Sequence, residues 1–519
     1  MNTTPQPPPV AATGSNYSYP WSPDGGDGTY RNPILYADYS DPDVIRHGDD
    51  FWMTASSFNC TPGLPILHST DLVNWTLVNH ALKAVPDARY QQVQPGCGVW
   101  APSIRFHAGK FWIFFPTPDE GIYVITATDP RGQWSEPHLL VAGKGLIDPC
   151  PFWDDDGKAY LVHAYAGSRA GIKHRLCVAP MAPDGTRLLG EGKIVFHEPD
   201  RHPTLEGPKF LKRDGWYYIL APAGGVATGW QTVLRSRDIY GPYEDKIVLQ
   251  QGNTSVNGPH QGALVDTPGG EWWFLHFQDV GLCGRIVHLQ PVEWRAGWPL
   301  MGALLDAEAA GEPVLQYRKP NLPSARIAVP ATSDEFSSSK LGLQWQWHAN
   351  HRDEWFSLAV RDGWLRLFAQ PGANDLSHTP NLLLQKFPAR SFRVETRLDC
   401  QSLQDGDEAG LAVMGNTHAA LAVRWTGTKM NVIYRSGECC EVLGELSVTE
   451  VRLAVEVADG GGCTFAWQTP TGQWLKALTV FQAQPGKWIG AKVGIYCLST
   501  LGKSAAGFGD FDYFRFAAV

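Results

Sequence analysis

A proline motif recurs five times in the first 300 residues of the chain. After each copy come a glycine-centred turn, as in His47-Gly48-Asp49, and an aromatic-rich run of strand-forming residues, as in Phe51-Trp52-Met53. The copies begin at Asp41-Pro42, Trp100-Ala101-Pro102, Asp148-Pro149, Glu206-Gly207-Pro208 and Gly258-Pro259. Short strands and glycine turns that repeat at roughly fifty residues predict a β-propeller, here with five blades.

Three of the five motifs carry a carboxylate, at Asp41, Asp148 and Glu206. The innermost strands of a propeller line its central channel, so side chains at equivalent repeat positions meet near one axis. Carboxylates crowded into one pocket repel each other, and their pKa values move apart, which suits acid/base chemistry. Taken alone, an Asp-Pro pair also fits a turn with no chemical role. Asp43 competes with Asp41, because side-chain alternation along a strand places both on one face.

A chain of 519 residues is too long for one ordinary core and predicts more than one domain. We expect an N-terminal extension over residues 1–29, the propeller over 30–305, an Ala- and Pro-rich linker over 306–332 and a second domain over 333–519. Short alternating strands, such as Trp364-Leu365-Arg366-Leu367-Phe368, predict a β-sandwich for the second domain. The predicted fold class is therefore all-β.

Composition excludes several classes of function. The net charge of −9, with no basic patch, argues against a nucleic-acid partner, and no apolar run is long enough to span a membrane. The ten cysteines form no Cys-x-x-Cys pair, so we expect no zinc site and mostly free, buried thiols. The 21 tryptophans suit stacking on sugar rings, although most are expected to pack between blades.

The first residues of the chain are polar and rich in proline, without the apolar segment of a signal peptide. They resemble the start of a mature exported chain more than that of an intracellular one. We therefore expect a secreted or periplasmic protein, with a cytoplasmic location as the alternative.

The first domain resembles glycoside hydrolase family 43, whose five-bladed propellers release xylose or arabinose from plant polysaccharides. The resemblance rests on the carboxylate motifs, on Asn32-Pro33, on Val99-Trp100-Ala101-Pro102-Ser103 and on Gly258-Pro259-His260-Gln261-Gly262. The second domain is similar to the concanavalin-like sandwich of β-xylosidase-type members, with Asp334-Glu335-Phe336 and Asp510-Phe511-Asp512-Tyr513-Phe514 as landmarks.

The resemblance implies three catalytic roles. Asp41 matches the general base, Glu206 the general acid, and Asp148 the carboxylate that orients the acid and tunes its pKa. An inverting hydrolase holds a water between its base and the sugar, so the two carboxyl groups stand apart. An ionised Asp148 is expected to raise the pKa of Glu206 by repulsion.

The resemblance also implies substrate and ion contacts. Arg285 matches an arginine that hydrogen-bonds sugar hydroxyls, and Phe58 and Trp100 are candidate walls for stacking on the ring. His260 matches a histidine that faces calcium or water at the centre of related propellers. The chemistry is expected to need no cofactor, with a bound calcium ion as an option at His260.

One feature departs from the family pattern. In related β-xylosidases a loop of the sandwich reaches over the pocket, often with an aromatic tip. Over residues 489–494 this chain has Lys492 where an aromatic residue is expected. Closure of the pocket, and with it strictly exo action, is not predicted from this segment.

The leading hypothesis is an inverting enzyme that releases terminal xylose or arabinofuranose from hemicellulose-derived oligosaccharides. A non-catalytic carbohydrate-binding propeller and an endo-acting arabinan or xylan hydrolase of the same fold are the alternatives. A retaining fructan hydrolase on the same fold is disfavoured. Such enzymes have a Trp-Met-Asn-Asp-Pro segment near their start, and this sequence lacks it.

Overall fold

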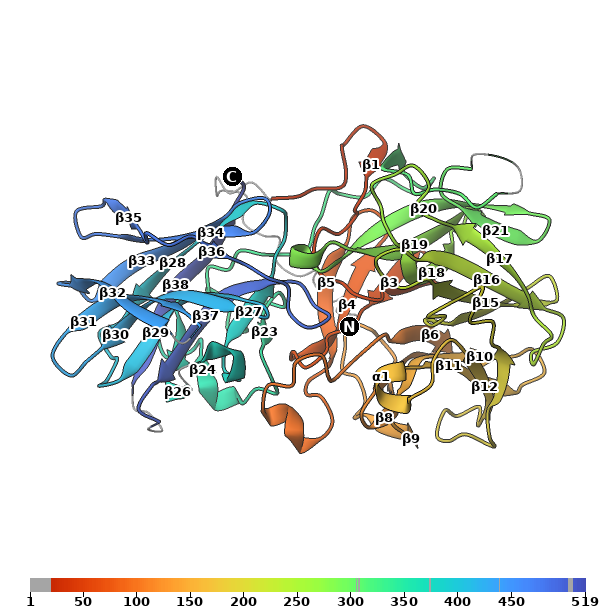
Figure 1. Cartoon of the computed structure of the whole chain (residues 1–519), viewed down its shortest axis with the longest axis horizontal. Helices are drawn as coiled ribbons and strands as arrows, with labels where there is room; N and C mark the ends of the chain where they lie inside the picture. The colour runs from red at the N-terminus through yellow and green to blue at the C-terminus, as the bar shows by residue number, and fades with distance from the viewer. Residues whose placement is uncertain (1–19, 305, 307–308, 373–374, 438, 503–506) are drawn as a thin grey trace, which may run out of the picture.

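The computed structural model describes residues 20–304, 306, 309–372, 375–437, 439–502 and 507–519. It contains two bodies, a propeller and a sandwich, which lie side by side (Figure 1). The predicted fold class, a five-bladed β-propeller followed by a β-sandwich, is confirmed. Most of the predicted N-terminal extension, residues 1–19, lies outside the described residues.

Each blade is a four-stranded antiparallel sheet whose strands follow one another in sequence. The blades comprise β2 (Asp43–His47), β3 (Asp50–Thr54), β4 (Gly63–Ser69) and β5 (Thr76–Leu82); β6 (Ser103–His107), β7 (Lys110–Thr117), β8 (Gly121–Ala127) and β9 (His138–Ala142); β10 (Leu146–Trp153), β11 (Ala159–Tyr165), β12 (Leu176–Met181) and β13 (Lys193–Phe196); β14 (Lys209–Arg213), β15 (Trp216–Ala223), β16 (Trp230–Ser236) and β17 (Glu244–Leu249); β18 (His260–Asp266), β19 (Trp272–Asp279), β20 (Arg285–Arg295) and β21 (Trp298–Met301).

Local sequence explains the hairpins and the packing between blades. Gly48, with φ of 65°, forms the left-handed turn that joins β2 to β3, a conformation that glycine adopts without steric cost. Aromatic side chains of neighbouring blades pack against each other, as Trp52 and Phe111 do with ring centroids 6.0 Å apart. Both rings belong to one buried cluster between the first and second blades. Packing between blades is thus one of the uses of the many aromatic residues.

The ends of the propeller region are tied together by a small sheet. Strand β1 (Thr29–Arg31) pairs with β22 (Gln316–Arg318), and Leu35 bridges to Val287 of the fifth blade. Residues 306–332, expected as an extended linker, thus include a strand that returns to the propeller. This pairing fixes the point from which the chain enters the sandwich.

In the described residues the sandwich consists of two sheets with eight strands each, antiparallel except for one parallel pairing. Strand β28 shows the sequence logic, because Phe392, Val394, Thr396 and Leu398 are buried while the residues between them are partly exposed. One sheet has the order β23 (Gln346–Trp347), β27 (Leu383–Lys386), β37 (Lys492–Ser499), β29 (Asp407–Met414), β30 (His418–Trp425), β31 (Met430–Ser436) and β32 (Cys439–Leu446), with β26 (Gln370–Pro371) beside β37 in a parallel pairing. The other has the order β24 (Phe356–Ser357), β25 (Leu365–Phe368), β38 (Phe508–Ala517), β28 (Phe392–Asp399), β33 (Glu450–Val457), β34 (Gly462–Gln468) and β35 (Trp474–Lys476), with β36 (Phe481–Gln482) beside β34.

Helices are few in the part of the chain that the structure describes. They are α1 (Gly167–Ala170) and the 3₁₀ turns η1 (Ala88–Gln91), η2 (Gly281–Cys283), η3 (Asp353–Trp355) and η4 (Leu376–His378). Among these described residues, no helix has the length and apolar character to cross a membrane.

Hydrogen bonds join the sandwich to the propeller at two places. Thr61, between β3 and β4, forms a β-bridge with Trp347 of β23. The sandwich loop before β37 contacts the fifth blade, where the Ala491 N–H donates to the Leu282 carbonyl at 2.7 Å. The Gly490 N–H donates to Asp38 Oδ2 at 3.0 Å. These contacts hold the loop over the propeller.

Candidate active site

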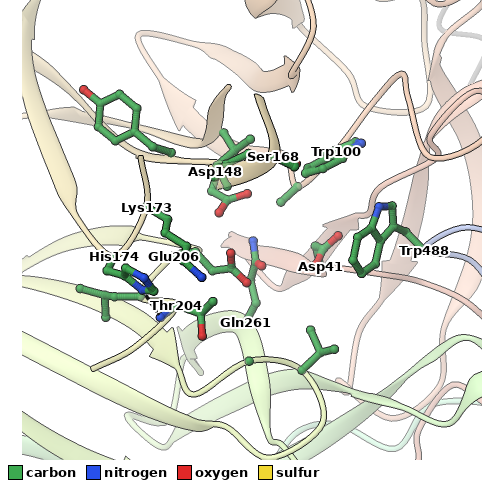
Figure 2. Close-up of a pocket in the computed structure, with 18 of the residues that line it drawn as sticks. Asp41, Trp100, Asp148, Ser168, Lys173, His174, Thr204, Glu206, Gln261 and Trp488 are labelled. Carbon is green, nitrogen blue, oxygen red and sulfur yellow. Dashed lines mark hydrogen bonds between the residues drawn. The ribbon is translucent and has the colours of Figure 1, made fainter. Parts of the chain in front are cut away.

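A cavity of about 580 Å³ is lined by residues from all five propeller repeats and from a loop of the sandwich. Asp41, Asp148 and Glu206 line it from the first, third and fourth blades, and Trp488 lines it from the sandwich. Figure 2 shows the three carboxyl groups directed into the same space. The structure therefore brings together the three carboxylates that the repeat predicts.

Strained backbone is concentrated at this cavity. Asp41 and Asp148 both have φ of 55°, which agrees with their equivalent places in the repeat. In the described part of the chain, fourteen non-glycine residues have positive φ, and seven of them line the cavity: Asp41, Phe58, Asp148, His174, Thr204, Gln261 and Trp488. Such conformations cost about 1–3 kcal/mol each and cluster at functional sites, where the surrounding structure enforces them.

Three donors hold the Asp41 carboxylate. Ser40 Oγ and Ser56 Oγ donate to Oδ2 at 2.8 and 2.6 Å, and Arg285 Nη1 donates to Oδ1 at 3.0 Å. Hydrogen bonds and a nearby cation both favour the ionised form of a carboxyl group. Asp41 is thus oriented and charge-compensated, as a general base requires.

Asp43, the rival of Asp41, lies elsewhere. It is fully buried, and its Oδ2 accepts from the Ile104 N–H at 2.7 Å and from Arg105 at 2.6 Å. The left-handed conformation of Asp41 breaks the extended alternation, so the two carboxylates do not share a face. Only Asp41 of the two lines the cavity.

Asp148 is coupled to Glu206 through both backbone and charge. The N–H of Gly207, the residue after Glu206, donates to Asp148 Oδ2 at 2.7 Å. Burial, and then repulsion from Glu206, raises the pKa of Asp148 to about 8. This raised pKa of Asp148 was not predicted from the sequence. Asp148 is the more buried of the two, because it is buried as a whole residue whereas the Glu206 side chain is 30% exposed.

Two carboxyl groups that repel each other titrate as a pair. A raised pKa at Asp148 therefore means that the pair keeps one proton up to near-neutral pH. Both carboxyl groups line the cavity, and Glu206 is the more exposed of the two, so it is the one better placed to reach a bound molecule.

His260 contacts Glu206 of this pair. Its Nε2 lies 3.1 Å from Glu206 Oε1, and the ring is fully buried. Among the described residues, no group of three or more His, Cys, Asp or Glu side chains is arranged to hold a metal ion. The contact that the structure gives His260 is one that orients Glu206.

The predicted substrate residues all line the cavity. Arg285 is buried beside Asp41, and its guanidinium lies 4.7 Å from the centre of the Phe277 ring. Phe58 and Trp100 stand together with ring centroids 6.5 Å apart. The cavity thus has an aromatic wall on the side of Asp41.

Trp488 extends that wall and was missed in the sequence. It lies just before residues 489–494, where the aromatic residue was expected, and its ring centroid is 6.5 Å from that of Trp100. The position expected to be aromatic, Lys492, is instead buried at the start of β37 and contacts Cys60. The sandwich therefore does supply an aromatic residue to the cavity, because the loop bends at Trp488 with φ of 64°.

Gln261 is a second residue that the sequence motif did not single out. Its side chain lies between the carboxylates in Figure 2. It is buried, and its Nε2 has no hydrogen-bond partner in the described structure. A buried donor without a partner is costly unless a ligand satisfies it. A sugar hydroxyl is a suitable acceptor.

Comparison with known proteins agrees with this geometry. The family model described as glycosyl hydrolases family 43 matches residues 30–299, and the beta xylosidase C-terminal concanavalin A-like domain matches residues 333–517. A protein of Xylanibacter ruminicola named putative beta-xylosidase is 42% identical over 92% of this chain and 87% of its own length. A Bacteroides ovatus protein named non-reducing end alpha-L-arabinofuranosidase is 27% identical over 95% of each chain.

Solved structures show the same architecture. The crystal structure of the GH43 protein BlXynB from Bacillus licheniformis superposes with a TM-score of 0.81 at 26% identity, covering 95% of this chain and 100% of that chain. The family match extends over both bodies of the structure, and the carboxylate cavity lies within the matched region. The chain is therefore a glycoside hydrolase that belongs to glycosyl hydrolases family 43.

Proposed function

We propose that the enzyme is an inverting, exo-acting hydrolase that releases terminal xylose, arabinofuranose or both from hemicellulose-derived oligosaccharides. The observation that carries the proposal is the composition of the cavity, which joins three carboxylates from separate blades to an aromatic residue, Trp488, from the sandwich. A cavity walled by both bodies favours the end of a sugar chain over its middle. Relatives named β-xylosidase and α-L-arabinofuranosidase support the choice of pentoses.

In the proposed mechanism Asp41 activates a water molecule. The carboxylate accepts the proton of the water as the water oxygen attacks the anomeric carbon. Ser40, Ser56 and Arg285 hold the carboxylate in place for this step. Asp41 comes from the first blade and Glu206 from the fourth. We expect water and sugar to bind between them, so that the attack inverts the configuration.

Glu206 protonates the departing glycosidic oxygen in the same step. Asp148 holds the backbone after Glu206 through the Gly207 N–H, and the repulsion between the two carboxyl groups keeps a proton on the pair. His260 fixes the other side of the Glu206 carboxyl group. Leaving groups that depart poorly as anions depend most on this proton.

The lining of the cavity suggests where the two parts of the substrate lie. Aromatic side chains near Asp41 suit the apolar face of the terminal sugar, while Arg285 and Gln261 offer donors to its hydroxyls. Lys173 and His174 line the cavity with Glu206 and suit the polar surface of the leaving-group sugar.

Side-by-side assays with aryl β-xyloside and aryl α-L-arabinofuranoside test this function. The proposal predicts hydrolysis of at least one of them, and release of single pentoses from the non-reducing end of oligosaccharides. Failure of the folded protein to cleave either compound would favour a non-catalytic binding propeller. Cleavage of internal bonds in a long chain would favour the endo-acting alternative.

A further inference from the structure

One lysine and one cysteine meet at the boundary between the two bodies. The Nζ of Lys492, at the start of β37, donates to the Sγ of Cys60 at 2.9 Å. Cys60 belongs to the propeller loop between β3 and β4. Both residues are buried, with Cys60 1% and Lys492 5% exposed. The contact joins positions 432 residues apart in sequence.

This surrounding is unusual for a buried lysine. Within the described residues, Lys492 forms no ion pair with a carboxylate, and Cys60 is the hydrogen-bond acceptor that the structure gives it. A buried ammonium ion without a partner of opposite charge costs several kcal/mol. A second lysine, Lys386, stands directly opposite on the neighbouring strand β27. The positive charge of Lys492 adds to burial in lowering the pKa of Lys386 to about 8.

The lysine of the pair borders a space that a small oxidant can enter. A cavity of about 120 Å³ lies between the two bodies and is lined by Asn59, Gly490 and Lys492, among others. This volume exceeds that of one water molecule several times, so hydrogen peroxide fits. A thiol held against an amine in an electropositive surrounding is a candidate for selective oxidation.

We propose that Cys60 and Lys492 form a reversible covalent bridge through one oxygen atom, Nζ–O–Sγ, when the protein meets peroxide. Two molecules of hydrogen peroxide are consumed. The S–H bond, one N–H bond and both peroxide O–O bonds break, while one S–O and one N–O bond form. The thiol and amine lose four electrons, each peroxide gains two, and three waters leave. A dithiol reductant returns the thiol, the amine and water.

The bridge would lie close to the segments that form the aromatic wall of the carboxylate cavity. Cys60 is two residues from Phe58, and Lys492 is four residues from Trp488, so the bridge would fasten together the two segments that carry this aromatic wall. The proposal rests on the interdomain contact and does not depend on which sugar the enzyme releases.

Peptide mapping by mass spectrometry tests the bridge in the full-length protein, before and after treatment with hydrogen peroxide and again after dithiothreitol. The expected result is a cross-linked pair of peptides containing Cys60 and Lys492, heavier than the two free peptides by one oxygen less two hydrogens, and lost on reduction. The exposed Cys439 and Cys440 report that the peroxide was effective. The melting temperature is expected to rise with the bridge and to return on reduction.

Matched variants sharpen the test. Cys60→Ser abolishes the cross-linked pair, while Cys440→Ser, at an exposed cysteine, leaves it intact. If Cys60→Ser does not fold, the peptide map of the wild-type protein is sufficient to test for the bridge. Recovery of Cys60 as a free thiol or sulfinic acid while Cys439 and Cys440 are oxidised overturns the proposal. A linkage without the added oxygen also overturns it.

Discussion

Replacing Asp148 by asparagine should stabilise the folded protein and lower its catalytic activity. Burial and repulsion from Glu206 raise the pKa of Asp148 from 3.8 to about 8. The unfolded chain releases this proton near the lower value, so between the two values the folded state binds more protons than the unfolded state. Stability therefore falls as the pH rises through this window. Asparagine carries no charge, and its amide oxygen can still accept the Gly207 N–H.

The size of the effect follows from the width of the window. Each pH unit in which only the folded state keeps the proton costs about 1.4 kcal/mol. From 3.8 to about 8 the upper bound is roughly 6 kcal/mol, of which roughly 4 kcal/mol is reached at neutral pH. Activity moves in the opposite direction. Loss of the carboxylate that positions Glu206 should lower kcat/KM on the order of 10²-fold.

Urea unfolding of wild type and Asp148→Asn at several pH values between about 4 and about 8 measures this difference. The variant should gain stability over wild type as the pH rises, and the pH-dependent gain should vanish at the acid end. Asp200→Asn, at an exposed aspartate, is the control and should show no such trend. A difference that does not change with pH would refute a protonated, buried Asp148.

Three further predictions follow from the site. Glu206→Ala should slow cleavage of oligosaccharides by about 10²–10⁴-fold and slow aryl glycosides with good leaving groups much less; an equal loss across a leaving-group series would exclude Glu206 as the proton donor. Gly490→Ala should lower kcat/KM by at least about tenfold, because its Cβ would lie 2.6 Å from the Gly284 nitrogen and displace the loop of Trp488. Gly444→Ala, where a Cβ meets open space, is the control, and equal activity of the two variants would show that the loop position is unimportant. If calcium binds near His260, a chelator should lower the melting temperature or the rate; no change, with no metal found by elemental analysis, would leave His260 as a partner of Glu206 alone.

The repeat carried most of the information about the fold and the carboxylates. Five copies of a repeat of about fifty residues predict five blades, and equivalent positions in a propeller converge on its axis. Asp41, Asp148 and Glu206 could therefore be placed together from the sequence alone. Arg285, Phe58 and Trp100 followed from the family resemblance, and all three line the cavity.

What the sequence could not predict depends on local backbone geometry and on contacts between the bodies. The left-handed conformation of Asp41 separates it from Asp43, and strand alternation alone gave the opposite expectation. Trp488 enters the cavity because its loop is held by Asp38 and Leu282, which are more than 200 residues away in sequence. The raised pKa of Asp148 was also not predicted, because its largest cause is the burial of this side chain in the folded structure.

The anomeric configuration of the first-formed sugar tests the central claim most directly. Asp41 and Glu206 both line the cavity, and we propose them as base and acid on opposite sides of a bound water and sugar. Proton NMR of an aryl pentoside hydrolysate, recorded before mutarotation, should show the product with configuration opposite to that of the substrate. Product that keeps the configuration of the substrate would contradict the assignment of Asp41 as general base.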